Sequence, residues 1–341
     1  MRRSAIMAAL LGVTLLSGAL LVADLYLFMK RPALAAGETV IYDIRAGTSF
    51  NQIAIELMQR EVLTRYVYWV ALARLQGKVQ AVKAGEYRLQ GPLTPQQLLD
   101  RLVSGKTRQF SLTVVEGWTF RQVMGALARH PQIESTLRDC KDLMAALGRP
   151  GMHPEGWFFP DTYHFPRGTT DLEFLRRGHE NMRRRLDELW SARDPGLPLK
   201  TPYEALILAS IVEKETAVPG ERPMIAAVFI SRLNKGMRLQ TDPTVVYGLG
   251  DGYDGDIRDR DLRADTPYNT YVHKGLPPTP IAMPSDAALR AVLHPAESNV
   301  LFFVAKPDGS HHFSATYDEH REAVIKYQLD GDASRYRTRI E

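Results

Sequence analysis

The chain has 341 residues and a formal net charge of +4, and hydrophobic and charged residues make up 45% and 24% of it. These proportions are ordinary for a globular protein, and the length predicts two or three domains. The basic excess is too small to indicate a nucleic-acid partner, and the single cysteine, Cys140, excludes an intramolecular disulfide and a zinc site of the multi-cysteine kind.

An uncharged, mostly apolar run extends from Ser4 to Ala23. About 20 residues at 1.5 Å each span the roughly 30 Å hydrocarbon core of a bilayer. A cleaved signal peptide is the alternative, with Ala33–Ala36 as its cleavage site, but the apolar region of a signal peptide is usually only about 7–15 residues long. The sequence therefore predicts a cytoplasmic stub and transmembrane anchor over residues 1–31, followed by a short linker, Pro32–Glu38.

Charged residues flank both ends of this run. Arg2 and Arg3 precede it, and Lys30 and Arg31 follow it. The first pair predicts a cytoplasmic N-terminus, while the second pair makes the orientation less secure than the span itself. No further apolar run of about 18 residues follows, so we expect a single-pass protein.

An internal repeat follows the anchor. Residues Ile44–Ile53 are echoed by Val114–Val123, and each copy places a β-type stretch before a glycine turn. Each copy then has Ser or Thr followed three residues later by Gln, the pattern of a capping box that starts a helix. The repeat predicts strand, turn and helix twice, with chance recurrence of a common unit as the alternative.

Between the copies, Thr64–Leu75 and Thr94–Val103 are predicted helices, and Ala84–Leu89 is a predicted turn and strand. Pro95 suits the first position of its helix. Strand, helix, helix and strand in this order resemble a LysM-like module over residues 39–106, a fold associated with glycan binding.

Residues 110–335 form a predicted larger α+β domain. Helices are expected over Thr201–Val218, Arg222–Asn234 and Ser285–Leu293, and Thr316 with Glu319 forms a capping box for a helix that ends near Gln328. Two short stretches around the turn Lys306–Ser310 predict a hairpin, and residues 236–284 are predicted as long polar loops. The fold class is therefore α+β, with an N-terminal helix, a small module and a larger domain.

Glu215 is the candidate catalytic residue of the first of these helices. Leu208, Ile211, Val212 and Glu215 follow at helical spacing and predict one apolar face, while Glu213 lies about 200° away. A carboxyl group on that face is partly desolvated, which raises its pKa and suits a general acid. The alternative is that the helix simply leaves the core at this residue.

Three other features carry weaker signals. His311, His312 and His320 with Glu319 lack the spacing of a metal motif and fit a hairpin and a helix start better, so no metal or cofactor is expected. The basic residues Arg176, Arg177 and Arg183–Arg185 are most simply a solvated helix face, with contact to an anionic polymer as the alternative. Trp157 is more typical of a core than of a sugar platform.

Taken in order along the chain, several motifs resemble the endolytic murein transglycosylase family, also called YceG-like. They are Glu155–Tyr163, Ala209–Thr216, Gly236–Val245, Pro267–Tyr271, Gly275–Pro278 and Leu301–Ala305. The resemblance implies a catalytic domain outside the cytoplasm and an acid/base glutamate in Glu213–Thr216, with the second glutamate, Glu215, as the catalytic one.

The resemblance also implies the chemistry. A lytic transglycosylase cleaves the MurNAc-GlcNAc bond with the sugar's own C6 hydroxyl as nucleophile and leaves a 1,6-anhydro-MurNAc end, so one carboxyl group suffices where an ordinary glycosidase needs two. The expected substrate contacts are Thr216, Gln240, Thr241, Asp242, Tyr268, Asn269 and Tyr271.

Simpler explanations exist for some of these residues. Asp242-Pro243 is also a turn signal, and Tyr268-Asn269 is also a loop cap. Asp242 as a second catalytic carboxylate would favour a hydrolase. A non-catalytic glycan-binding scaffold is the other alternative.

The expected location is the cell inner membrane with a periplasmic catalytic domain. Expected partners are peptidoglycan glycan strands and the membrane, with peptidoglycan synthases as candidates.

Overall fold

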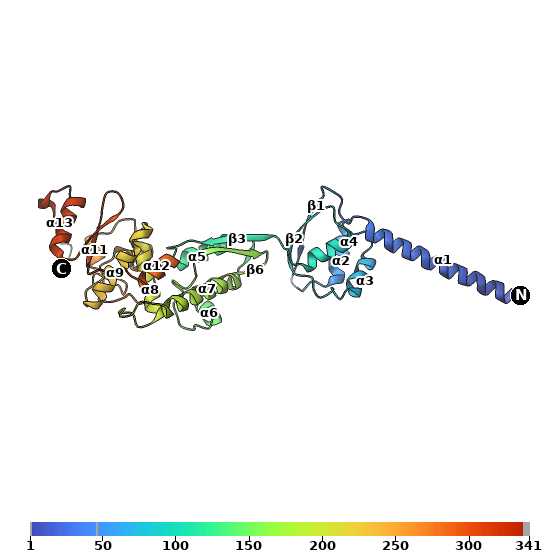
Figure 1. The fold of residues 1–341 in the computed structure, drawn as a ribbon, viewed down its shortest axis with the longest axis horizontal. Helices are drawn as coiled ribbons and strands as arrows, with labels where there is room; N and C mark the ends of the chain where they lie inside the picture. The colour runs from blue at the N-terminus through green and yellow to red at the C-terminus, as the bar shows by residue number, and fades with distance from the viewer. Residues whose placement is uncertain (1, 46, 337–341) are drawn as a thin grey trace. The chain divides into compact units, whose positions relative to one another are not determined.

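The structure is a computed structural model that describes residues 2–45 and 47–336. The chain divides into two compact units (Figure 1). The first comprises Met1–Phe110 and His164–Thr169, and the second comprises Ser111–Tyr163 and Thr170–Glu341. Both units combine helices with short two-stranded sheets, which confirms the mixed α+β class.

Helix α1, Arg2–Lys30, opens the first unit. Its segment Leu11–Lys30 is the one helix of the described residues that is long and apolar enough to cross a membrane. The end of this helix packs onto the unit: Phe28 is 5% exposed and meets the edge of Tyr68, whose hydroxyl donates to Asp24 at 2.8 Å. The expected linker is also part of the fold, because Leu34 is buried and bridges to Leu93. An apolar side chain is more stable in the core than in water, so this irregular segment packs onto the unit through Leu34.

The core of the first unit lies between a two-stranded antiparallel sheet and three helices. Strands β1 and β2 pair antiparallel, and the elements are β1 Thr39–Ile44, α2 Phe50–Gln59, α3 Tyr66–Leu75, β2 Gly85–Gln90 and α4 Pro95–Val103. Alternate residues of β1, Tyr42 and Ile44, point into the core. Phe50 stacks on Trp69 with ring centroids 4.7 Å apart, and the Trp69 indole donates to the carbonyl of Pro95.

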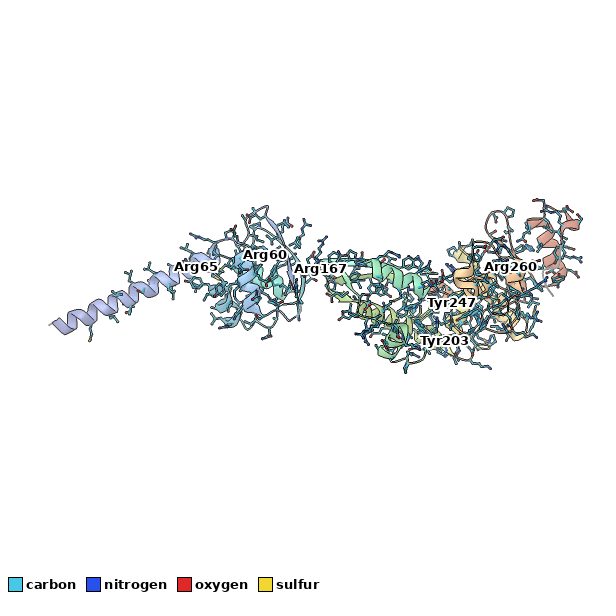
Figure 2. All side chains as sticks on the ribbon, turned by 180° about the vertical axis from the view of Figure 1, so that it is seen from behind. Arg60, Arg65, Arg167, Tyr203, Tyr247 and Arg260 are labelled. Carbon is cyan, nitrogen blue, oxygen red and sulfur yellow. The ribbon has the colours of Figure 1, made fainter. Side chains whose placement is uncertain are left out.

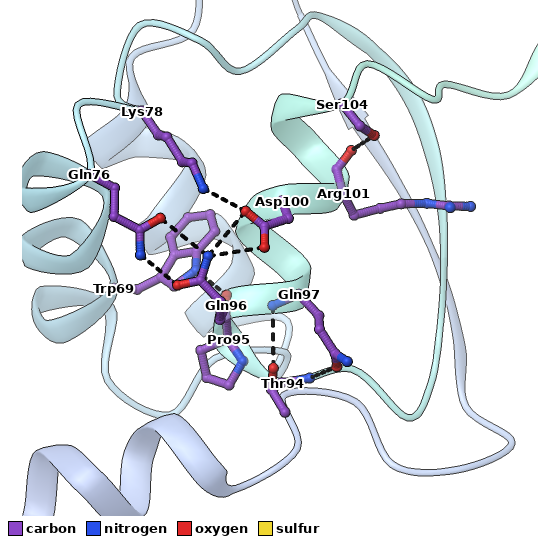
Figure 3. A network of polar contacts seen from close by, with 10 residues as sticks. All are labelled: Trp69, Gln76, Lys78, Thr94, Pro95, Gln96, Gln97, Asp100, Arg101 and Ser104. Atoms are coloured by element: carbon purple, nitrogen blue, oxygen red, sulfur yellow. Dashed lines mark hydrogen bonds and ion pairs between the residues drawn. The ribbon is translucent and has the colours of Figure 1, made fainter.

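A polar network ties α3 to α4 (Figure 3). Lys78 follows α3 and contacts Asp100 at 2.7 Å, while the amides of Gln76 and Gln96 bond each other. Thr94 caps α4 through a capping box. The helix order predicted for this region is present, with Pro95 at the first position of α4 as expected.

Glu86 is the buried acid of the first unit. Arg108 and Arg167 each donate to one of its carboxylate oxygens, at 2.9 and 2.7 Å. Burial alone would raise the pKa of Glu86, but the two guanidinium groups outweigh it and lower the pKa. Arg167 belongs to the segment His164–Thr169, so both ion pairs lie within the first unit.

From β3 onward the chain is mainly helical, with two-stranded sheets β3–β5, β4–β6 and β7–β8. Strands β3, β5 and β6 each contain residues of both units, and the other elements belong to the second unit. The α-helices and strands of this part are β3 Gln109–Val114, α5 Phe120–Arg129, β4 Ile133–Glu134, α6 Cys140–Ala146, β5 Asp161–Pro166, β6 Thr169–Thr170, α7 Asp171–Ser191, α8 Pro202–Glu215, α9 Arg222–Asn234, α10 Asp242–Leu249, α11 Asp259–Leu262, α12 Asp286–Leu293, β7 Phe302–Ala305, β8 His311–Ser314 and α13 Tyr317–Gln328. The predicted hairpin is present, since β7 and β8 pair antiparallel.

The internal repeat has the predicted structure in both copies. β1 leads into α2, and β3 leads into α5. Ser49 accepts a hydrogen bond from the N–H of Gln52, and Thr119 does the same for Gln122. These caps satisfy N–H groups that the first turn of a helix leaves without partners.

Helix α8 is the centre of the second unit and contacts α7, α9, α10 and α12. Its apolar residues are buried on every side, including Leu206 and Ala209. The predicted single apolar face was therefore wrong, because neighbours enclose the helix all round. The helix ends at Glu215 rather than Val218, since Thr216 has an extended backbone.

Helix α10 lies in the region predicted as loop. It begins with Asp242 and Pro243. Proline is common in the first turn of a helix, where its missing N–H has no role. The sequence signal taken for a turn was thus a helix start.

Candidate active site

Glu215 occupies the last position of the buried helix α8. One of its carboxylate oxygens, Oε1, accepts a hydrogen bond from the Thr241 hydroxyl. Thr241 is the residue immediately before α10, so the end of α8 and the start of α10 meet at this carboxyl group.

The environment of Glu215 favours its protonated form. Burial raises its pKa from 4.5 to about 7, the Thr241 hydroxyl opposes the rise, the charge of Asp242 adds to it, and the charge of Arg232 reduces it. The residue is only partly exposed. A carboxyl group with this pKa exchanges its proton near neutral pH, as an acid/base catalyst requires.

Backbone and hydroxyl contacts fix Thr241 in place. Its N–H donates to the hydroxyl of Thr270 at 3.1 Å, and its carbonyl accepts from the hydroxyl of Thr244 at 2.7 Å. The preceding residue, Gln240, has φ of 51°, a left-handed conformation that is costly for a residue with a side chain. The fold therefore holds a strained residue beside the carboxyl group, which is common at functional sites.

Asp242 and Tyr271 form a pair next to Thr241. The Tyr271 hydroxyl donates to Asp242 Oδ1 at 2.6 Å. Asn269 is completely buried, and its amide donates to the carbonyls of Asp261, Leu262 and Ala264. Its oxygen accepts from the N–H of Tyr271. The structure thus uses Asn269 to hold the loop that carries Tyr271.

The other two predicted contacts also have partners within the protein. Thr216 is 5% exposed and accepts from the N–H of Val218 at 2.9 Å. Tyr268 bonds the hydroxyl of Thr279 at 2.9 Å and packs its ring edge-on against Tyr247. The structure brings Thr241 to Glu215, whereas Tyr268 belongs to a neighbouring aromatic cluster.

Arg232 was not predicted from the sequence. Its guanidinium is buried, donates to the carbonyls of Leu301 and Leu239 at 2.7 and 2.6 Å, and lowers the pKa of Glu215 by its charge. An arginine on a helix with buried Ile225 and Phe229 at helical spacing is a signal that could have identified it.

Glu213 has a different environment from Glu215. Its side chain is only 5% exposed, contacts Arg222 Nη2 at 3.3 Å and accepts from the N–H and hydroxyl of Ser285. The expectation that helical phase separates a buried Glu215 from a Glu213 turned away from the core was wrong. The two carboxylates differ in their partners: Glu213 has a direct cationic partner, and Glu215 has a hydroxyl.

Glu155 is a second buried acid that sequence reasoning missed. It accepts from the N–H of Phe120 at 2.8 Å and from the hydroxyl of Tyr247 at 2.9 Å. Burial raises its pKa to about 7, in spite of these hydrogen bonds. Tyr247 lies on α10 and Tyr203 on α8, and both are labelled in Figure 2. Their rings pack against Tyr268 and Trp157, respectively. Glu155 therefore connects the start of α5 to α10 through its two carboxylate oxygens.

Trp157 and the histidines are explained by packing and pairing. Trp157 is 3% exposed and stacks on Tyr203, so it is a core residue. His311 contacts Glu221 at 2.7 Å, whereas Glu319 caps α13. Within residues 2–45 and 47–336, no group of three or more His, Cys, Asp and Glu residues is placed to hold a metal ion.

Comparisons with known proteins agree with the resemblance of the motifs. A model of the YceG-like family matches residues 42–326. An endolytic murein transglycosylase from Bacillus subtilis (strain 168) is 31% identical over 308 residues, which are 85% of each chain. Another, from Streptococcus pneumoniae (strain R6), is 29% identical over 72% of this chain and 51% of its own. The 2.6 Å crystal structure of a putative YceG-like protein from Listeria monocytogenes has a TM-score of 0.53 and 29% identity, and it covers 84% of this chain and 99% of its own.

Proposed function

The chain belongs to the YceG-like family, and on this premise we propose that it is a membrane-anchored lytic transglycosylase that cleaves murein glycan strands internally. Its enzyme class is lytic transglycosylase, the class of its relatives from Bacillus subtilis and Streptococcus pneumoniae. The observation that carries the proposal is the Glu215 carboxyl group, which has a pKa of about 7 at the junction of α8 and α10.

Glu215 acts first as an acid and then as a base. Its proton passes to the glycosidic oxygen as the bond from MurNAc C1 to that oxygen breaks. The C6 hydroxyl oxygen of the same MurNAc then bonds to C1, and its proton returns to Glu215. Atoms balance without water, and the product ends in 1,6-anhydro-MurNAc.

The raised pKa supports both steps, because the group gives and takes a proton at similar cost near neutral pH. Asp242 supports them indirectly, since its charge raises the pKa of Glu215.

We assign the substrate contacts to polar groups around this carboxyl. Gln240, Thr241, Asp242 and Tyr271 cluster at the start of α10 and the loop beside it. Thr216 follows Glu215 directly, and Tyr268 completes the predicted set. Asn269 serves the site by holding its loop.

Anchoring by an uncleaved helix is supported by the first unit. Cleavage after Ala36 would remove Phe28 and Leu34, which belong to the buried core. We therefore propose a single-pass protein of the cell inner membrane with residues 1–31 as stub and anchor, a cytoplasmic N-terminus and a periplasmic catalytic domain over residues 110–335.

Residues 39–106 are proposed as a LysM-like glycan-binding module. The order of β1, α2, α3 and β2 supports this assignment. The partners proposed are peptidoglycan glycan strands and peptidoglycan synthases, so that cleavage terminates nascent strands.

End-group analysis tests the function. The protein is incubated with purified glycan strands, and the masses of the products are measured by mass spectrometry. Anhydro ends are expected, lighter by one water than reducing ends. Glu215→Gln should lower their formation by about 10² to 10⁴. Reducing ends in their place would indicate a hydrolase with Asp242 as the second carboxylate, and binding without new ends would indicate a scaffold.

A further inference from the structure

A polar hollow of about 360 Å³ lies in the second unit, away from Glu215. Its walls come from α7 and from the loop that follows α6. Arg176, His179 and Arg183 line it from α7, and Arg149 lines it from the loop. The volume is in the range of small-molecule sites.

The spacing of the α7 residues places them together. Positions 176, 179 and 183 are three and seven residues apart and therefore share one face of the helix. Gly148 ends the preceding turn with φ of 75°, and Arg149 then lies over the ring of Trp157 at 4.9 Å. Glu180 is the one carboxylate among the lining residues, which include three arginines, and Arg176 also donates to the carbonyl of Ala146 at 3.3 Å.

His179 is the buried polar residue in the wall of the hollow. The residue is 4% exposed, and its Nε2 atom is buried without a hydrogen-bond partner. An unpaired buried polar atom costs about 1–3 kcal/mol, so proteins rarely keep one. Trp157, whose ring neighbours His179, has a buried and unpartnered Nε1 as well.

The ring of His179 is a neutral partner rather than another cation. Burial lowers its pKa, and the charges of Arg149 and Arg183 lower it further. The hollow thus presents planar guanidinium forks beside a neutral imidazole. Guanidinium forks match carboxylate geometry, with two parallel hydrogen bonds.

We propose that this hollow binds a carboxylate of the peptide stem carried by the murein strand. The proposal rests on the proposed function and deepens it, because it makes peptide-bearing strands the preferred substrate. Trp157 stacks on Tyr203 in the first turn of α8, and Glu215 ends that helix about 18 Å further on. The stem bound in the hollow therefore belongs to a sugar some distance from the bond that is cleaved.

Binding is tested with the full chain in detergent, carrying Glu215→Gln so that no substrate is consumed. The probes are a murein stem tripeptide with free carboxylates, the same peptide with its carboxylates amidated, and inorganic phosphate, each followed by calorimetry. The free peptide should bind at least tenfold more tightly than the amidated peptide. Arg176→Ala and Arg183→Ala should each weaken its binding about tenfold, which is about 1.4 kcal/mol.

Arg184→Ala is the matched control. It removes the same charge from the next residue of the same helix, but Arg184 does not line the hollow, so binding should stay within twofold. Equal binding of both peptides, or equal losses in all three variants, would overturn the proposal. Tighter binding of phosphate than of the peptide would assign the site to a phosphate-bearing ligand instead.

Activity gives a separate result. With an intact Glu215, the protein should cleave peptide-bearing strands with a lower KM than strands stripped of peptides by an amidase. Arg176→Ala/Arg183→Ala should remove this difference, and Arg184→Ala should keep it. A parent that prefers stripped strands contradicts the proposal. A parent that forms no anhydro ends from either strand contradicts the proposed function, while peptide binding in the calorimeter would still support the hollow.

Discussion

Replacing Glu215 with glutamine should make the second unit more stable above neutral pH. The fold raises the pKa of Glu215 from 4.5 to about 7, so the folded protein holds a proton that the unfolded chain releases. Between these two values the folded state binds more protons, and the free energy of unfolding therefore falls as pH rises. Glutamine removes this dependence because its amide does not titrate in this range.

The size of the effect follows from the pKa. At about 1.36 kcal/mol per pKa unit, the interval from 4.5 to about 7 corresponds to roughly 3 kcal/mol. The variant and the parent should have similar stability below pH 4.5, and the gain should grow between pH 4.5 and 7 and level off above about pH 8. Glutamine keeps an acceptor for the Thr241 hydroxyl, so this hydrogen bond contributes little to the difference.

Calorimetric melting in detergent from pH 4 to 8.5 measures this gain. About 3 kcal/mol should raise the melting temperature of a unit of this size by roughly 6–12 °C at high pH. Other titrating groups are common to both proteins and cancel in the difference. A difference that is constant between pH 4.5 and 8 would refute the raised pKa and, with it, the argument for Glu215 as the acid.

Three further predictions test contacts of other residues. Glu213→Gln should lower the free energy of unfolding near neutral pH by about 3 kcal/mol, and with it the melting temperature, because Arg222 keeps a buried charge without its carboxylate; an unchanged melting temperature would contradict the pairing. Thr241→Val removes a hydrogen bond that lowers the pKa of Glu215, so the loss of end-forming activity at alkaline pH should move to higher pH, and movement in the other direction would contradict the assigned contact. Phe28→Ala should destabilise the first unit by about 3–5 kcal/mol, measured by hydrogen exchange in β1 and α3, and unchanged exchange would show that the end of α1 does not pack there.

Local signals predicted the starts of helices well. Helices α8, α12 and α13 begin next to Thr201, Ser285 and Thr316, where helix starts were expected, and all three side chains accept hydrogen bonds from the first turns. Such caps involve residues three apart, so the sequence contains both partners. Proline near a helix start is ambiguous, which is why α10 was missed at Pro243.

Contacts between distant residues could not be predicted in this way. Glu155 and Tyr247 are 92 residues apart, and Glu213 and Ser285 are 72 residues apart. Nothing in either neighbourhood indicates its partner. The motif resemblance selected the glutamate that the site geometry supports, but the helical-phase argument did so for a wrong reason, because α8 has no exposed face.

The packed end of α1 has a mechanical consequence. Asp24, Phe28 and Leu34 join the helix to the first unit without a flexible segment between them. With α1 in a bilayer, the first unit cannot swing freely as it would on a loose tether, and rotation of the helix in the membrane turns the unit with it. The direction in which the unit faces is then set by the tilt of one helix, so bilayer thickness becomes a variable that alters how the proposed glycan-binding module meets a strand.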